Sequence, residues 1–135
     1  MDFILDTSIC VHWLKGNRRV ADRIDVRPTS VVTITFITVA ELYFGAYKSG
    51  RVEHNVAEVD HLVAAVRVLE STPAASKRFG QIKAQLQQRG KPLDDADLFI
   101  AAFALEQDAV LVTDNEKHFR RITGLKVKNW LRDSG

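Results

Sequence analysis

Short, solidly apolar segments alternate along this chain with longer segments in which apolar residues recur every three or four positions. The solid runs are typical of buried strands, and the spaced runs are typical of helices that cover a sheet. Because such strands alternate with helices, we expect a three-layer α/β/α sandwich with a central parallel sheet of four to five short strands. The predicted strands cover residues 3–5, 31–34, 66–69, 110–113 and 125–127.

Capping residues and glycines mark the ends of the helices expected between these strands. Asp6-Thr7-Ser8 begins one helix, and Thr72-Pro73 begins another, which Gly90 ends. Both Thr35 and Thr38 are suitable N-caps for the helix that leads up to Tyr47, so its start stays open. The predicted helices cover residues 7–14, 18–25, the segment that ends at 47, 52–66, 73–89 and the segment from 92 through 106.

Composition indicates one globular domain, for which we expect the boundaries 1–135. Apolar residues make up 46% of the chain and charged residues 27%, which excludes disordered and fibrous classes. A single cysteine, Cys10, excludes an internal disulfide and a multi-cysteine zinc site. The longest apolar run, Leu98–Leu105, is too short to span a membrane, and Met1-Asp2-Phe3 does not begin a secretion signal. We therefore expect a cytoplasmic protein with no membrane partner.

The distribution of charge is more informative than the net charge of +2. Basic residues are dispersed along the chain, whereas Asp94, Asp95 and Asp97 lie close together. Two further acids, Asp6 and Asp114, directly follow the first and fourth predicted strands. Since the carboxyl ends of parallel strands meet at one edge of the sheet, these two acids are expected at the same edge. Taken alone, each could simply cap the helix that follows it.

Asp97 is expected to point into the protein from the first turn of its helix. It shares a helical face with Ile100 and Ala101, in a segment that is apolar all round. A buried carboxylate is costly unless it is paired or bound to a cation. A first-turn acid can instead interact with the helix dipole, but Asp94 and Asp95 are better placed for that role.

Glu41 has two interpretations, which depend on where its helix begins. If Thr38 is the N-cap, Glu41 completes a capping box by accepting a hydrogen bond from the Thr38 amide. If Thr35 is the N-cap, Glu41 lies in the middle of the helix, on one face with Gly45, which permits close packing. Considered together with three other acids, a role as a metal ligand is the better interpretation.

These four acids have no matching Lys or Arg nearby in sequence, so they would repel one another and raise their pKa values. The set is Asp6, Glu41, Asp97 and Asp114. A divalent cation removes the repulsion, and ligands that are all oxygen suit Mg²⁺ or Mn²⁺. Such a site can activate water and stabilise a phosphodiester under attack without a dedicated nucleophile.

Four segments carry recognisable motifs: ILDTS at 4–8, TVAELYFGA at 38–46, GKPLDDADLFIAA at 90–102 and LVTDN at 111–115. In this order and at this spacing, the first three resemble the motifs of PIN-domain nucleases. The fourth, together with Phe119, Leu125 and Trp130, resembles the C-terminal signature of the VapC toxin subfamily. The resemblance extends from residue 2 to about residue 131, and therefore over nearly the whole chain.

This resemblance implies a Mg²⁺- or Mn²⁺-dependent endoribonuclease that forms dimers and is the toxin of a type II toxin–antitoxin module. It implies RNA as the substrate and a VapB-type antitoxin as the inhibitor in a higher complex. Ser8 and Asn115 match neighbouring polar positions of the family site, whereas Asp94 and Asp95 stand where small residues are common. By motif position, the family's catalytic and metal-binding acids are Asp6, Glu41, Asp97 and Asp114.

The alternative is a non-catalytic receiver-like or partner-binding α/β domain with an acidic cation site. A receiver-like domain needs an Asp after the third strand, where this chain has Glu70-Ser71-Thr72-Pro73. A phosphotransfer enzyme of the haloacid-dehalogenase type needs a second acid at the position of Ser8. The presence of all four acids argues against a domain that only binds a partner.

Histidines and crevice aromatics are assigned structural roles. His54 and His61 are expected to face solvent, and His12 and His118 have no metal-ligand spacing. Core packing is the default role of the aromatic residues, and a groove for the antitoxin or the dimer partner is the alternative. In that alternative, an apolar patch near Tyr43 and Tyr47 is where the partner docks. The aromatic residues in question are Trp13, Tyr43, Phe44 and Tyr47.

Overall fold

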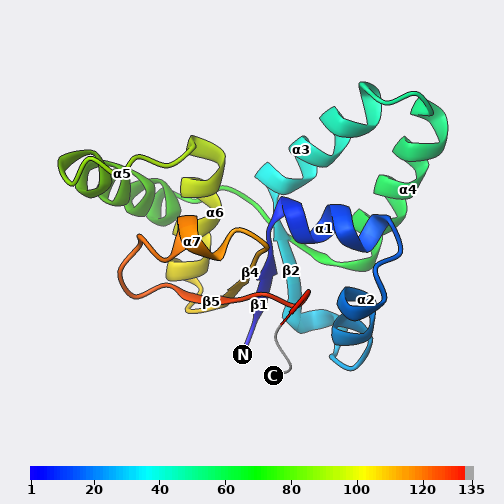
Figure 1. The fold of residues 1–135 in the computed structure, drawn as a ribbon, viewed down its shortest axis with the longest axis horizontal. Coiled ribbons are helices and arrows are strands. Elements are labelled where there is room, and N and C mark those ends of the chain that lie inside the picture. Colours follow the sequence, from blue (N-terminus) through cyan, green and yellow to red (C-terminus); the bar gives the residue numbers. More distant parts are fainter. Residues whose placement is uncertain (133–135) are drawn as a thin grey trace.

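A computed structural model describes residues 1–132, and Figure 1 shows a central sheet with helices on both of its faces. Five parallel strands form the sheet in the order β3-β2-β1-β4-β5. They are β1 (Phe3–Leu5), β2 (Val32–Thr35), β3 (Arg67–Leu69), β4 (Val110–Val112) and β5 (Lys126–Lys128). The predicted three-layer α/β/α sandwich is confirmed. Residues 133–135, the end of the expected 1–135 domain, lie outside the described residues.

Helices α1 to α4 cover one face of the sheet, and α5 to α7 cover the other (Figure 1). No helix within residues 1–132 is long and apolar enough to cross a bilayer. The bounds are α1 (Thr7–Leu14), α2 (Arg18–Asp25), α3 (Phe36–Tyr47), α4 (Val52–Ala65), α5 (Pro73–Gln88), α6 (Asp95–Glu106) and α7 (Glu116–Phe119), with a 3₁₀ turn, η1 (Thr29–Val31).

Each face of the sheet has its own hydrophobic core, because successive side chains of a strand point to opposite faces. Ile4 and Leu111 pack with α5 and α6, whereas Leu5 and Val112 pack with α1, α3 and α4. Helix α6 is buried along most of its length, as its uninterrupted apolar sequence predicts. Apolar burial on both faces fixes the central strands, and with them the residues that follow each strand.

The strand order changes direction at β1, which lies between β2 and β4. The chain moves from β1 outward through β2 and β3, and then crosses back to β4 and β5. In open parallel sheets, the crevice at such a reversal is the usual ligand site. Asp6 follows β1 and Asp114 lies two residues beyond β4, so both acids lie at this reversal.

Several predicted boundaries are wrong by one residue. Val31 belongs to the 3₁₀ turn, so β2 begins at Val32 and continues to Thr35, which pairs with Leu69 of β3. Val66 belongs to neither element, because it is the C-cap of α4 with extended backbone. Leu125 lies in the turn before β5, which therefore begins at 126. The 3₁₀ turn was not predicted, since it is too short to show helical periodicity.

Candidate active site

Asp6 is almost fully buried at the end of β1, with 2% of its surface exposed. Its Oδ1 accepts hydrogen bonds from the Ile9 amide at 3.0 Å and from the Ser8 hydroxyl at 2.6 Å. Its Oδ2 accepts one from the Thr113 hydroxyl. Burial raises the pKa of Asp6 and the charge of Asp114 adds to the rise, although the three hydrogen bonds oppose it. Asp6 is therefore both the N-cap of α1 and a buried acid.

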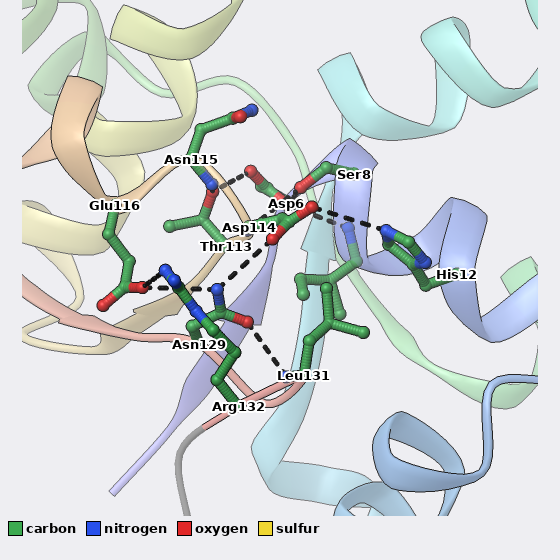
Figure 2. A network of polar contacts seen from close by, with 11 residues as sticks. Asp6, Ser8, His12, Thr113, Asp114, Asn115, Glu116, Asn129, Leu131 and Arg132 are labelled. Atoms are coloured by element: carbon green, nitrogen blue, oxygen red, sulfur yellow. Dashed lines mark hydrogen bonds and ion pairs between the residues drawn. The ribbon is translucent and has the colours of Figure 1, made fainter.

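Asp114 lies beside Asp6 and is more open to solvent, with 41% of its side chain exposed. Its Oδ1 accepts a hydrogen bond from Asn129 Nδ2 at 3.3 Å, and its Oδ2 lies 3.5 Å from His12 Nε2 (Figure 2). Asp114 does not cap α7, because Asn115 occupies the N-cap position. His12, for which a structural role is expected, contacts this acid through its imidazole.

Asp97 lies in the first turn of α6 and is half-buried. Its pKa is raised to about 6, chiefly by burial and then by the charges of Asp6, Asp94 and Glu41, while His118 acts in the opposite direction. The carboxylate of Asp97 therefore interacts with Asp94 at the start of its own helix and with two acids distant in sequence, Asp6 and Glu41. This agrees with the expectation that Asp97 points inward.

Asp94 and Asp95 lie at the start of α6, the position expected for acids that interact with the helix dipole. Asp94 occupies the N-cap position, but its side chain accepts no capping hydrogen bond. Asp95 lies at the surface, where its Oδ1 is 3.0 Å from Lys83 Nζ. The extra acids of this motif thus differ from Asp97: Asp95 is paired with a lysine, and Asp94 adds to the negative field around Asp97.

Glu41 lies in the middle of α3, because Thr35 is the N-cap and accepts a hydrogen bond from the Thr38 amide at 3.3 Å. The capping-box interpretation is therefore wrong. The Glu41 side chain is exposed, and its Oε1 accepts a hydrogen bond from Thr7 Oγ1 at 2.5 Å. Since Thr7 directly follows Asp6, this contact holds α3 and Glu41 against the end of β1.

The two supporting residues have different surroundings. The Ser8 hydroxyl donates to Asp6 and accepts from the Asp114 amide at 3.2 Å, so it links two of the four acids. The Asn115 side chain makes no hydrogen bond among residues 1–132, and in Figure 2 it points away from Asp6. Its backbone amide donates to Thr113 Oγ1 at 2.9 Å.

Sequence reasoning missed Thr113, Thr7 and Asn129, each of which holds one of the acids. Thr113 is fully buried at the end of an apolar strand, and a hydroxyl in that place is a sequence signal. Asn129 is fully buried before Trp130, and its Nδ2 also donates to Glu116 Oε1 at 3.2 Å. Glu116 is in turn paired with Arg132, as Figure 2 shows, and with Arg120.

The donor set suits a hard divalent cation, because it consists of carboxylate oxygens. Asp6 is buried without a Lys or Arg partner among residues 1–132, and its pKa and that of Asp97 are raised. A bound cation would supply the positive charge that Asp6 and Asp97 lack. As the side chains lie, however, no three acidic, histidine or cysteine groups of the described chain are close enough to hold one ion. Rotation of the exposed acids, Glu41 and Asp114, would have to complete the site.

A groove of about 310 Å³ opens beside Glu41, between α1, α3 and α4. Its lining is largely apolar and includes Leu14, Leu42 and Val59. Trp13 and Tyr43 pack against the core on this side, as expected by default, and the Tyr43 hydroxyl donates to Asp60. Core packing is the wrong expectation for two aromatics of α3, since Phe44 is 66% exposed and Tyr47 63% exposed.

Comparison with known proteins gives concordant results. The family model described as "PIN domain" matches residues 3–125. Ribonuclease VapC2 of Haemophilus influenzae is 33% identical over 97% of this chain and 99% of the relative. The tRNA(fMet)-specific endonuclease VapC of Shigella flexneri is 34% identical over 96% of this chain and 98% of the relative. A chain in the crystal structure of DNA-bound VapBC from Salmonella typhimurium superimposes with a TM-score of 0.91. It is 34% identical, and the match covers 96% of this chain and 98% of that chain.

Proposed function

From its membership of the PIN-domain family, to which this chain belongs alongside the VapC ribonucleases, we propose that it hydrolyses RNA phosphodiester bonds with a divalent cation. The observation that carries the proposal is the buried acid Asp6, which lies at the reversal of strand order and interacts electrostatically with Asp97 and Asp114. A receiver-like signalling domain is not favoured, because the VapC relatives cover the whole chain.

Asp6, Glu41, Asp97 and Asp114 would hold Mg²⁺ or Mn²⁺. When bound, the ion lowers the pKa of water and neutralises charge on the phosphate under attack. Hydrogen bonds from the surrounding residues orient the acids, and Glu41 and Asp114 would rotate away from their present contacts to reach the ion. Ser8 and Thr113 hold the two oxygens of Asp6, and Thr7 holds Glu41. Asn129 and His12 hold the two oxygens of Asp114, and Asn115 lies at the open rim of the site.

The protein also acts, in this proposal, as the toxin of a type II module with a VapB-type antitoxin. A relative solved as a VapBC complex, 34% identical, supports the partnership. The groove between α1, α3 and α4 suits an apolar antitoxin segment and opens beside Glu41, so a bound segment would lie next to the acids. The exposed side chains of Phe44 and Tyr47 provide a second apolar patch, for the antitoxin or for a second copy in a dimer.

Substitution of the clustered aspartates tests the assignment of the site. Asp97→Asn keeps the shape of the side chain but removes one ligand charge, so RNA cleavage should fall by about 100-fold or more. Asp94→Asn and Asp95→Asn should retain most activity. Asp95→Asn removes only an exposed ion pair, which costs at most about 1 kcal/mol. The assay is initial-rate cleavage of labelled RNA at saturating Mg²⁺. Loss of cleavage in Asp94→Asn or Asp95→Asn, with Asp97→Asn active, would refute the assignment.

A further inference from the structure

A second groove lies on the other side of the sheet, between α5, the end of α6 and the turn that follows α7. It encloses about 220 Å³. Its walls carry three guanidinium groups, from Arg78, Arg89 and Arg121, and the amides of Gln81 and Gln85. The aliphatic residues beneath them are mostly buried, so the surface that a ligand meets is polar and basic.

The charge of this groove is only partly neutralised. Arg78 Nε lies 3.0 Å from Glu106 Oε1, so one guanidinium is paired. Arg121 Nη1 donates to the carbonyl oxygen of Pro92 at 3.1 Å, which orients the group without cancelling its charge. Arg89 is exposed and has no partner among residues 1–132. Two positive charges, beside two amide side chains that can donate hydrogen bonds, are therefore available to an anionic ligand.

The groove leads away from the acidic site along the α5–α6 hairpin. Lys83 contacts Asp95 near one end of the hairpin, and Arg78 contacts Glu106 at the other. Arg89 directly follows α5, close in sequence to the start of α6, where Asp97 lies. Eleven residues of helical rise separate Arg78 from Arg89, or about 16 Å, which is long enough for a few successive phosphates.

We propose that this basic groove, defined by Arg78, Gln81, Gln85, Arg89 and Arg121, binds the phosphate backbone of RNA along the α5–α6 hairpin, at a distance from the bond that is cut. The inference rests on the proposed function, because that function makes RNA the polyanion that reaches the neighbouring acids. A polar groove with guanidinium groups fits a phosphodiester strand, since guanidinium recognises phosphate through paired hydrogen bonds. An amphipathic protein helix would need exposed apolar anchors, and the apolar groove beside Glu41 supplies those instead.

The test uses unfractionated tRNA as the probe and the charge-reversal variant Arg89→Glu. Loss of a phosphate contact should raise the KM for tRNA cleavage and the Kd for tRNA by about tenfold, with kcat within a factor of two. The slope of log Kd against log salt should become shallower by about one. Gln85→Lys adds a charge to the same wall, so it should lower Kd and steepen the slope. Arg18→Glu is the matched control, because Arg18 is exposed on α2, across the sheet, and has no partner within residues 1–132.

Anisotropy binding is measured beside cleavage so that this inference and the proposed function fail separately. If the wild-type protein binds tRNA but does not cleave it, the proposed function fails and the Kd values still decide on the groove. Equal Kd and salt slope for Arg89→Glu, Gln85→Lys and the wild type would overturn the inference. So would an Arg18→Glu effect as large as that of Arg89→Glu, since binding would then follow net charge alone.

Discussion

A carboxylate with 2% of its surface exposed, such as Asp6, has lost the hydration that would stabilise its charge, and three hydrogen bonds replace only part of it. One of these bonds caps α1, and the Ser8 and Thr113 bonds place the two oxygens at the reversal of strand order. The same side chain therefore begins a helix and supplies a site acid. The sequence analysis treated helix capping and metal binding as alternative roles for Asp6. In the structure Asp6 caps α1, and this position is also compatible with the proposed binding of a cation.

The stability of the metal-free protein should depend on the protonation of Asp97. Its folded pKa of about 6 lies above the ordinary value of 3.8, so the folded state holds this proton more tightly than the unfolded state. The resulting contribution to stability is fully present below pH 3.8 and is lost as pH rises through 6. Asp97→Asn has no such proton to lose. The Tm of this variant minus the Tm of the wild type should therefore increase from pH 4 to pH 7, measured in the presence of a chelator.

Thermal melts of both proteins across that pH range, without metal and with excess Mg²⁺, provide the measurement. Mg²⁺ should raise the wild-type Tm at pH 7 more than that of Asp97→Asn, because binding to the folded state alone stabilises it. A Tm difference that stays constant from pH 4 to pH 7 would show that neither burial nor the neighbouring acids raise the pKa of Asp97 in the folded protein.

The inward position of Asp97 was predictable because helical periodicity is local: residues three and four apart share a face. The roles of Thr113 and Asn129 were not predictable in the same way. Thr113 contacts Asp6 across 107 positions of sequence, and Asn129 reaches Asp114 only because β5 pairs with β4. A single sequence carries no local signal for such a pair beyond a polar residue inside an apolar stretch.

At the scale of elements, strands and long helices were predictable because burial on both faces produces solid apolar runs and helical packing produces a 3.6-residue period. The start of α3 was not, since Thr35 and Thr38 are chemically equivalent caps. The choice of Thr35 follows from β2, which pairs with β3 through Thr35 and leaves that residue extended at the helix entrance. Strand pairing, a non-local property, thus decided the place of Glu41 in the helix.

The segment that follows β5 positions the turn between β4 and α7. Asn129 is fully buried, and its amide donates to both Asp114 and Glu116. Asn129→Ala removes both bonds, so kcat for RNA cleavage should fall by about 10- to 100-fold, the usual cost of losing a residue that orients a metal ligand. The Mg²⁺ concentration needed for half-maximal activity should rise, while the KM for RNA should change little.

Arg120→Ala is the matched control, because it removes an exposed ion pair to Glu116 and leaves the bond from Asn129 to Asp114 intact. This control should retain nearly wild-type kcat and Mg²⁺ dependence. Equal losses in Asn129→Ala and Arg120→Ala, with an unchanged Mg²⁺ requirement in both, would mean that Asn129 supports only the fold.

At the scale of the whole molecule, the sheet separates two surfaces of different chemistry, and the acids lie between them. The α1–α4 side carries the apolar groove and the exposed aromatics of α3, and the α5–α7 side carries the basic groove. This arrangement lets an apolar antitoxin segment and an RNA strand approach the same acids from opposite sides. The sandwich was predictable from the alternation of strands and helices, whereas the two grooves depend on how helices distant in sequence pack together.

The central claim is that these acids cleave RNA only when they hold a divalent cation. The most direct test is RNA cleavage by the purified protein, free of any partner, in EDTA and after addition of excess Mg²⁺ or Mn²⁺. Cleavage should be abolished in chelator and restored by either ion, because the acids without the ion repel one another and have no means to neutralise the phosphate. Hydrolysis at full rate in chelator would contradict the claim and transfer the chemistry to the histidines nearest the acids, His12 and His118.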